Sequence, residues 1–443
     1  MTGIVVRGIF VGALAGLLMG FDTAIIAGTT GQLRMLYALS PTGLGITVSS
    51  ALWGSLLGAL LAGKPGDRFG ARDCLKVIAL LYLVSSVGSS LVWSWPALLI
   101  FRLMAGVAVG ASTVLAPVYV AEISPPRWRG AMVGSFQMSI VLGILLAYLC
   151  SSLLGLAELG AAEWRWKFAM AVLPSLLLFL FLYAIPNSPR WLALRGFATE
   201  ARETLLAINP EIRQSEQDAI LFPHEAQSAR LEWRRHRKPI MLAFAIAAFN
   251  QLSGINAILY YINDIFAAAG FNRTSADHQA IIVGATNLIF TLIALVLIDS
   301  FGRRRLLLTG SVGLFAALAG TGLIMATGQH QDLLLYMLIL FIAAFAFSQG
   351  SVIWVYISEI FPTEVRARGQ SIGSSTHWLL DALIAAAFPV AAAFSRSFPF
   401  FFFAAMMMLQ FIVVLVWFPE TRRTSLEKIS VAVTEPGHPS VRS

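Results

Sequence analysis

Three ionisable residues stand inside long apolar stretches of the sequence. They are Asp22, Arg102 and Asp381, and a charged side chain at the centre of a bilayer costs roughly 2.5–3.5 kcal/mol even on the lenient insertion scale. Asp22 and Arg102 can form an ion pair that merely cancels charge, or a proton switch in which neutralisation of Asp22 frees Arg102. We favour the switch. Asp381 either pairs with His377, four residues earlier, or is a polar packing residue, and both interpretations stay open.

Amide and aromatic side chains occur in the same apolar stretches. Amides both donate and accept hydrogen bonds, and flat aromatic rings can cover weakly apolar faces, so together they can bind a neutral polyhydroxyl compound. The amides are Gln137, Gln251, Asn256 and Asn287, and the aromatic residues are Trp354 and Trp378. The alternative is structural: hydrogen bonds between helices for the amides, and lipid or interfacial packing for the tryptophans.

The composition indicates what must position these residues. Of the 443 residues, 58% are hydrophobic and 12% are charged, whereas an ordinary soluble protein carries about 25% charged residues. A bilayer core needs about 20 apolar residues in a helix. Twelve such runs occur, at 8–28, 44–62, 75–94, 97–120, 131–154, 167–186, 239–268, 279–298, 306–326, 333–357, 370–392 and 397–418. The sequence therefore predicts an all-α polytopic membrane protein with twelve transmembrane helices.

The formal net charge of +8 is explained by topology. With the N-terminus in the cytoplasm, the basic residues of the outside loops are Arg34, Arg165, Lys167, Arg273 and Arg396. Most of the other Lys and Arg residues then lie on the cytoplasmic side, as the positive-inside rule requires. We therefore expect no nucleic-acid partner, both termini in the cytoplasm and, from the short loops and tail, a bacterial inner membrane.

Three motifs recur along the chain at a nearly constant offset. Residues 67–70 match 299–302, residues 122–125 match 359–362, and residues 186–190 loosely match 419–422. Such recurrence indicates two parallel repeats of six helices, with a substrate site expected between them near the midplane. The predicted parts are an N-terminal half over 1–186, a cytoplasmic linker over 187–238, a C-terminal half over 239–418 and a short cytoplasmic tail over 419–443. Within the linker, 201–208 and 225–238 resemble short charged helices.

The motifs resemble those of the sugar porter family of the major facilitator superfamily, and bacterial proton-coupled monosaccharide symporters in particular. The segments that carry the resemblance are 63–72, 117–125, 129–130, 187–192, 251–256, 260–261, 359–366 and 419–422. Segment 63–72 indicates only the superfamily. The patterns at 251–256 and 260–261, and the Pro-x-Ser-Pro-Arg pattern at 186–190, restrict the resemblance to sugar porters. The resemblance implies the major facilitator fold, in two six-helix halves.

The resemblance also implies a sugar site. The residues that fall on sugar-site positions are Gln137, Asn250, Gln251, Asn256, Tyr260, Asn287, Trp354, His377 and Trp378. Two of them depart from the family pattern: Asn250 stands where a Gln is usual, and His377 where a Gln or Asn is common. The identity of the sugar therefore stays open. Proton-coupled members have an acid at the position of Asp22, so the resemblance favours H⁺ as the coupling ion and implies no other cofactor.

Acids and arginines alternate in the recurring motifs. They are Asp67, Arg68, Arg72, Glu122 and Arg129 in the first half, with Asp299, Arg303, Glu359 and Arg366 in the second. We interpret them as gating residues that pair across the halves and close the cytoplasmic side. Orientation in the membrane alone would explain the arginines but not the acids. Asn187 stands where the family usually has Glu, so one such pairing is expected to be lost.

The residues show no nucleotide-binding loop, metal cluster or nucleophile–base arrangement, so we expect no enzyme. The predicted function is import of a monosaccharide by proton symport through alternating access, by a monomer. A facilitative uniporter and a transporter of a polyol or another organic solute remain alternatives. A non-transporting sugar receptor is less favoured, because the polar tail is short.

Overall fold

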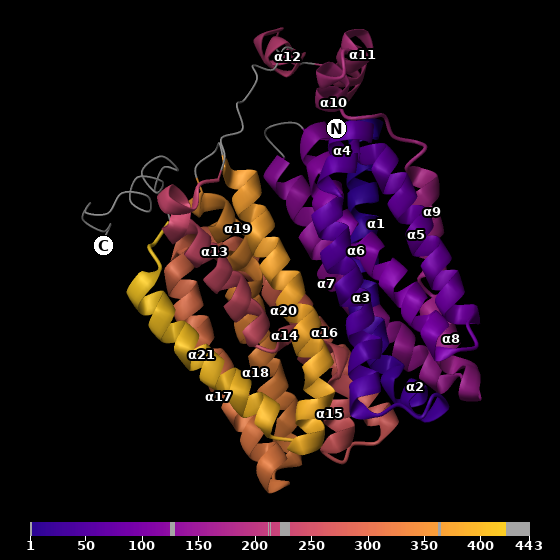
Figure 1. The fold of residues 1–443 in the computed structure, drawn as a ribbon, viewed down its shortest axis with the longest axis vertical. Coiled ribbons are helices and arrows are strands. Elements are labelled where there is room, and N and C mark those ends of the chain that lie inside the picture. The colour runs from indigo at the N-terminus through magenta and orange to yellow at the C-terminus, as the bar shows by residue number, and fades with distance from the viewer. Residues whose placement is uncertain are drawn as a thin grey trace. The chain divides into compact units, whose positions relative to one another are not determined.

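A computed structural model describes residues 2–124, 129–210, 212, 214–221, 231–361 and 365–421. All regular elements in these residues are helices (Figure 1). The helices are α1 (Gly3–Ile25), η1 (Ile26–Gly28), α2 (Thr30–Leu36), α3 (Pro41–Leu61), α4 (Gly63–Phe69), α5 (Ala71–Leu91), α6 (Trp95–Ile123), α7 (Arg129–Leu156), η2 (Gly160–Ala162), α8 (Glu163–Ala169), α9 (Val172–Phe181), α10 (Pro189–Leu194), α11 (Ala198–Ile208), α12 (Gln214–Leu221), α13 (Trp233–Leu252), α14 (Ile255–Tyr260), α15 (Ile262–Ala268), α16 (Arg273–Phe301), α17 (Arg303–Thr327), η3 (Gln331–Leu333), α18 (Leu334–Phe347), α19 (Gln349–Ile360), α20 (Arg366–Phe394) and α21 (Phe398–Trp417).

Twelve helical segments of the described chain are long and apolar enough to cross a membrane. Their number confirms the prediction, but some boundaries differ. The sixth segment runs over Gly160–Phe181 instead of 167–186, because η2 and α8 begin it earlier and bury Trp164. The third begins at Ala71 instead of 75, directly after Gly70.

The contacts divide the chain into two compact units. The first contains residues 1–33 and 50–226, and the second contains residues 34–49 and 227–443. Compared with the predicted halves, the linker helices α10 to α12 group with the first unit, and residues 34–49 group with the second. In that second unit, Arg34 forms an ion pair with Asp264 at 3.0 Å.

The packing within each unit repeats. In the first unit α1 packs on α7, α5 on α6, and α5 on α9. In the second unit α13 packs on α20, α17 on α18, and α17 on α21. These are the corresponding pairs when the seventh span is matched to the first, so the internal repeat read from three short motifs extends to the packing of whole helices.

The predicted seventh and tenth spans are interrupted in the structure, as is the sixth between α8 and α9. The seventh breaks after Leu252, where Gly254 adopts φ +80°, and again at Tyr261. Gly254 also lies against α21, since a Cβ there would come 2.3 Å from the Phe403 ring. The tenth breaks at Ser348. Interrupted helices of this kind form binding sites in many transporters, and the break at Gly254 precedes two of the predicted sugar-binding residues.

Glycines allow α1 to approach α7 and α3 to approach α6 within the first unit. A Cβ on Gly20 would lie 1.8 Å from the carbonyl oxygen of Ile140, and one on Gly106 would lie 1.8 Å from that of Ala51. No side chain fits at such distances, so small residues set the spacing of these helices.

The linker differs from the prediction at its C-terminal end. Residues 201–208 are helical, as part of α11. Of the second predicted helix, 225–230 lie outside the described residues. The basic residues 234–238 form the first turns of α13, with a kink at His236, because the apolar seventh span continues directly from them.

Candidate substrate and coupling sites

The first site is an ion pair within the membrane-spanning part of the first unit. Arg102 on α6 donates from Nη1 to Oδ1 of Asp22 on α1. The Arg102 side chain is 4% exposed and that of Asp22 is 19% exposed, and the guanidinium carbon lies 5.5 Å from the centre of the Phe168 ring. The structure thus brings together the two residues predicted to form the proton switch.

A second buried ion pair lies in the same unit and was missed from the sequence. Lys167 Nζ lies 2.7 Å from Oε1 of Glu163, and both side chains are almost fully buried. Lys167 also donates to the carbonyl oxygen of Gly28 at 2.7 Å, and Gln32 donates to Glu163 at 3.2 Å. The sequence places Lys167 in an outside loop, which is wrong, because the sixth segment begins at Gly160 and includes it. The i,i+4 spacing of the two charges was the available signal.

The second site lies in the second unit. It is a group of hydrogen-bonded polar side chains, here called the amide cluster, consisting of Asn250, Gln251, Asn256, Tyr260, His377 and Asp381. Gln251 Nε2 donates to Asn250 Oδ1 at 3.2 Å and lies 3.0 Å from Nδ1 of His377. Asn256 Nδ2 donates to Gln251 Oε1 at 3.3 Å. Most of the predicted sugar-binding residues of this unit are therefore in one network.

Asp381 is part of this network. Its Oδ2 accepts hydrogen bonds from Asn256 Nδ2 at 2.9 Å and from the Tyr260 hydroxyl at 3.0 Å. The sequence left open whether Asp381 pairs with His377. Asp381 accepts from Asn256 and Tyr260. The ring of His377 instead lies against the Gln251 amide, so Asp381 and His377 belong to different parts of the cluster.

Two tryptophans flank the imidazole of the cluster. The ring centres of Trp354 and Trp378 each lie 5.4 Å from that of His377. Trp354 is half-buried and Trp378 is buried. Aromatic rings can cover the apolar face of a sugar, and the neighbouring amides can bind its hydroxyls.

The remaining predicted sugar-binding residues are not in this network. Asn287 is buried on α16 and accepts a long hydrogen bond of 3.5 Å from Thr291. Gln137 belongs to α7 in the first unit, where it is half-buried.

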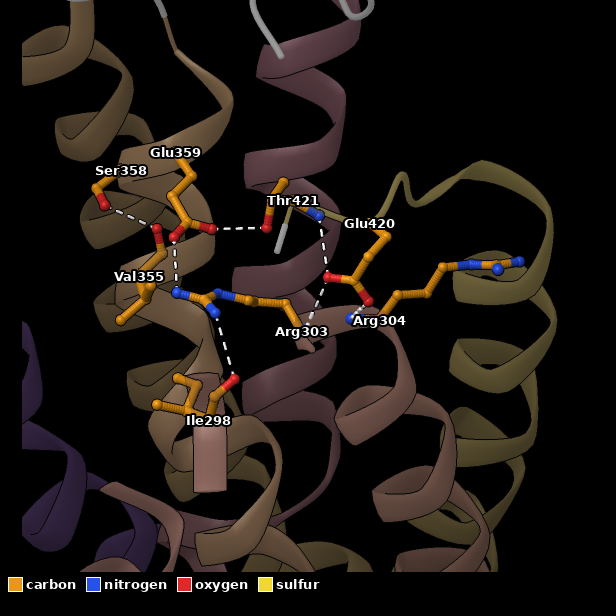
Figure 2. Close-up of polar contacts among 8 residues, drawn as sticks. All are labelled: Ile298, Arg303, Arg304, Val355, Ser358, Glu359, Glu420 and Thr421. Carbon is orange, nitrogen blue, oxygen red and sulfur yellow. Dashed lines mark hydrogen bonds and ion pairs between the residues drawn. The ribbon is translucent and has the colours of Figure 1, made fainter. Parts of the chain in front are cut away.

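The recurring motifs of the second unit meet around Arg303, as Figure 2 shows. Arg303 Nη2 pairs with Glu359 Oε1 at 2.9 Å, and Nη1 donates to the carbonyl oxygen of Ile298 at 3.2 Å. The other carboxylate oxygen of Glu359 accepts from the Thr421 hydroxyl at 2.6 Å. Two predicted gating residues, Arg303 and Glu359, are thus paired within one unit.

Glu420 caps the helix that begins at Arg303. Its carboxylate accepts from the backbone N–H groups of Arg303 at 2.9 Å and Arg304 at 3.2 Å (Figure 2). A carboxylate at a helix N-terminus satisfies otherwise unpaired donors and interacts favourably with the helix dipole. The corresponding position of the first unit is Asn187, whose Oδ1 is buried without a hydrogen bond among the described residues. The departure noted at Asn187 therefore removes a helix cap.

Other contacts at this end recur in both units. The Tyr119 hydroxyl donates to the carbonyl oxygen of Pro186 at 2.9 Å, and that of Tyr356 donates to Pro419 at 3.2 Å. Gly70 and Gly302 begin equivalent helices at φ +86° and +89°. The internal repeat is thus preserved down to single hydrogen bonds.

The other predicted gating residues of the first unit have different surroundings. Arg72 pairs with Asp73 at 2.9 Å and donates to the carbonyl oxygen of Ile185 at 3.2 Å. Glu122 accepts a hydrogen bond from Ser188.

Asp67 and Arg68 have exposed side chains, and their backbone carbonyls accept from Arg195. The side chains of Arg129, Asp299 and Arg366 lie outside the described part of the structure. Pairing across the halves stays a prediction.

Taken together, these features define a multi-pass membrane transporter. Residues 8–433 match the family model described as sugar (and other) transporter, and the chain belongs to this family.

Relatives with similar sequences include proteins named as proton symporters. The chain is 35% identical over 431 residues to the arabinose-proton symporter of Bacillus subtilis, covering 94% of this chain and 92% of the relative. It is 32% identical to the D-xylose-proton symporter of Escherichia coli, covering 96% and 95% of the two chains.

Solved structures of the E. coli xylose transporter XylE are also similar. Its partially occluded inward-open conformation matches with a TM-score of 0.86 and 31% identity, covering 96% of this chain and all of the other. XylE bound to 6-bromo-6-deoxy-D-glucose matches with a TM-score of 0.79 and 30% identity, covering 97% and 99%. The chain therefore has the major facilitator fold that the sequence predicted.

Proposed function

We propose that this protein imports a monosaccharide together with a proton, by alternating access. The observation that carries the proposal is the Asp22–Arg102 ion pair, a carboxylate held by a buried cation inside membrane-spanning helices. The names of the relatives support the substrate class, since they include symporters of arabinose, xylose and galactose. We infer an aldopentose or aldohexose as substrate.

Asp22 is the proton carrier of the proposal. As a carboxylate it holds Arg102; when it takes up a proton the attraction between the two side chains is lost, and the protein changes conformation with sugar and proton bound. Release of the proton on the other side restores the pair. Because both helices belong to one unit, protonation acts first on the packing of α1 against α6.

The amide cluster is the sugar-binding part of the proposal in the second unit. A sugar hydroxyl can both donate and accept, and so can an amide. Trp354 and Trp378 supply flat faces beside His377 for the ring of the sugar. Asn287, in the same unit, is proposed to bind the sugar as well, and Gln137 is proposed as a sugar-binding residue of the first unit.

The remaining parts of the proposal concern setting and partners. We infer a bacterial inner membrane with both termini in the cytoplasm, a monomer, and no cofactor besides the coupling proton. The motif residues are proposed to gate the cytoplasmic side, with the Arg303–Glu359 pair holding one unit rigid when the gate opens.

Uptake by the purified protein in proteoliposomes tests the proposal. Radiolabelled monosaccharides and polyols are offered with and without an imposed proton gradient. A gradient contributes about 2.3 kcal/mol per proton and 100 mV, enough for roughly 50-fold accumulation. We expect accumulation of at least one aldose that collapses when a protonophore is added. Equilibration without accumulation would instead identify a uniporter, and accumulation of a polyol alone would exclude the monosaccharide.

A further inference from the structure

Asp381 is a buried acid at the centre of a cluster made otherwise of amide, phenol and imidazole side chains. It lies on α20, is 1% exposed, and uses a single oxygen, Oδ2, to accept from Asn256 Nδ2 and the Tyr260 hydroxyl. Asn256 and Tyr260 are four residues apart on α14 and therefore lie on one face of that helix. Asp381 thus joins α20 to the short helix that follows the break at Gly254.

This contact fixes the orientation of the Asn256 amide. An amide can present either its oxygen or its NH₂ group to a neighbour, so its orientation depends on the partner. A carboxylate oxygen can only accept, and in a neutral carboxyl group with its proton on Oδ1, Oδ2 is still a carbonyl acceptor. Asn256 must therefore turn its NH₂ group toward Oδ2, both for the carboxylate and for a carboxyl group protonated on Oδ1.

The orientation of the Asn256 amide in turn fixes that of the Gln251 amide. The second N–H of Asn256 goes to Oε1 of Gln251, and the Nε2 group of Gln251 is directed at Asn250 Oδ1 and at the ring of His377. Both NH₂ groups are thereby committed to protein acceptors. The side-chain group that Asn256 retains for a ligand is its carbonyl oxygen, an acceptor.

We propose that Asp381 is a positioning residue that sets the selectivity of the transporter, by making Asn256 an obligate acceptor for one hydroxyl of the sugar. The inference rests on the proposed function, in which the amide cluster binds the sugar. The hydroxyl that meets Asn256 must donate a hydrogen bond. An amide in place of Asp381 would accept or donate with equal ease, and the Asn256 amide would then be able to turn around.

Deoxyfluoro sugars test this directly, because fluorine can accept a hydrogen bond but cannot donate one. Each hydroxyl of the transported monosaccharide is replaced in turn by fluorine or hydrogen, and the analogues compete with uptake of the radiolabelled parent. For the wild type we expect one carbon at which the fluoro and deoxy analogues are both about tenfold weaker than the parent. In Asp381→Asn the fluoro analogue at that carbon recovers to within about threefold of the parent, while the deoxy analogue stays weak.

Two further variants keep the test decisive if Asp381→Asn folds poorly. Joint replacement of Gln349 and Gln410 by Met removes two amides that bond to each other outside the amide cluster, so its fluorine discrimination should equal that of the wild type. Asn256→Ala removes the acceptor, and the parent should fall to the level of its fluoro analogue at that carbon. Two results would overturn the role of Asp381. One is that Asn256→Ala still binds the parent sugar better than the fluoro analogue at that carbon. The other is that a folded Asp381→Asn shows the same affinities for the fluoro analogues as the wild type. A wild type that takes up no monosaccharide would contradict the proposed function itself.

Discussion

Arg102 and Asp22 form an ion pair in which the two partners are unequally accessible. The guanidinium side chain is 4% exposed and packs near Phe168, whereas the carboxylate side chain is 19% exposed. The carboxylate is therefore the more accessible partner, and the cation is covered by protein. This asymmetry fits the proposed proton carrier, in which the carboxylate is the more accessible partner and its counter-charge stays in place.

Removal of Arg102 alone should be more damaging than removal of both charges. Arg102→Gln leaves Asp22 without its cation inside the membrane-spanning region, and breaking a buried pair costs about 3 kcal/mol. The double variant Asp22→Asn/Arg102→Gln leaves two neutral amides that can bond to each other. We expect thermal unfolding in detergent to show the largest loss for Arg102→Gln and partial recovery in the double variant. A double variant less stable than Arg102→Gln would mean that the pair does not couple.

The close approach of α3 and α6 should not tolerate a methyl group. A Cβ on Gly106 would lie 1.8 Å from a carbonyl oxygen, so Gly106→Ala forces the helices apart at a cost of about 1–3 kcal/mol. We expect a lower unfolding temperature and slower uptake. Gly134→Ala on α7 is the matched control, because a Cβ there meets nothing within 4 Å. Equal effects of the two substitutions would contradict the packing argument.

Glu420 should stabilise the N-terminus of α17 by charge. Glu420→Gln keeps an oxygen that can accept from Arg303 but loses the favourable interaction with the helix dipole, so about 1 kcal/mol should be lost. Unfolding in detergent at low salt measures this loss, which should shrink as salt is added. Glu158→Gln, at an exposed residue, serves as the control and should have no effect. A loss independent of salt would indicate that shape and not charge is responsible.

Some amides inside the membrane-spanning helices should bind the sugar, and others should only join helices. Gln251→Ala removes the residue that joins Asn250, Asn256 and His377, and we expect sugar affinity to fall at least tenfold, or about 1.4 kcal/mol. Gln349 and Gln410 are the control pair, bonded to each other at 2.7 Å between α19 and α21. Their joint replacement by Met should leave affinity within twofold of the wild type. Sugar titrations followed by tryptophan fluorescence distinguish these outcomes.

The sequence predicted the number of spans and the internal repeat, because apolar length and recurring motifs are local properties. The breaks in the seventh and tenth spans were not predicted. Gly254 adopts its left-handed conformation against Phe403, which is 149 residues away in the sequence, and no local pattern reports such a neighbour. The buried pair of Glu163 and Lys167 was missed for a different reason: its i,i+4 spacing is a local signal, but the pair lies at the edge of a span.

The candidate site was predicted in composition but not in connectivity. Amides and aromatic residues in apolar helices indicated hydroxyl binding, and the pairing of Asp22 with Arg102 followed from the cost of an isolated charge. The contact between Asn256 and Asp381 joins residues 125 positions apart. Which of several polar groups an acid meets depends on helix rotation and on the break at Gly254, and neither is encoded in residue spacing.

Transport by Asp22→Asn, compared in two modes in the same proteoliposomes, tests the central claim most directly. Exchange of radiolabelled sugar against unlabelled sugar needs the site and the conformational change but no net proton movement, whereas accumulation under a proton gradient needs the coupling. Asp22→Asn should exchange sugar at a rate comparable to that of the wild type and should accumulate none above equilibrium. Undiminished accumulation by Asp22→Asn would contradict the account.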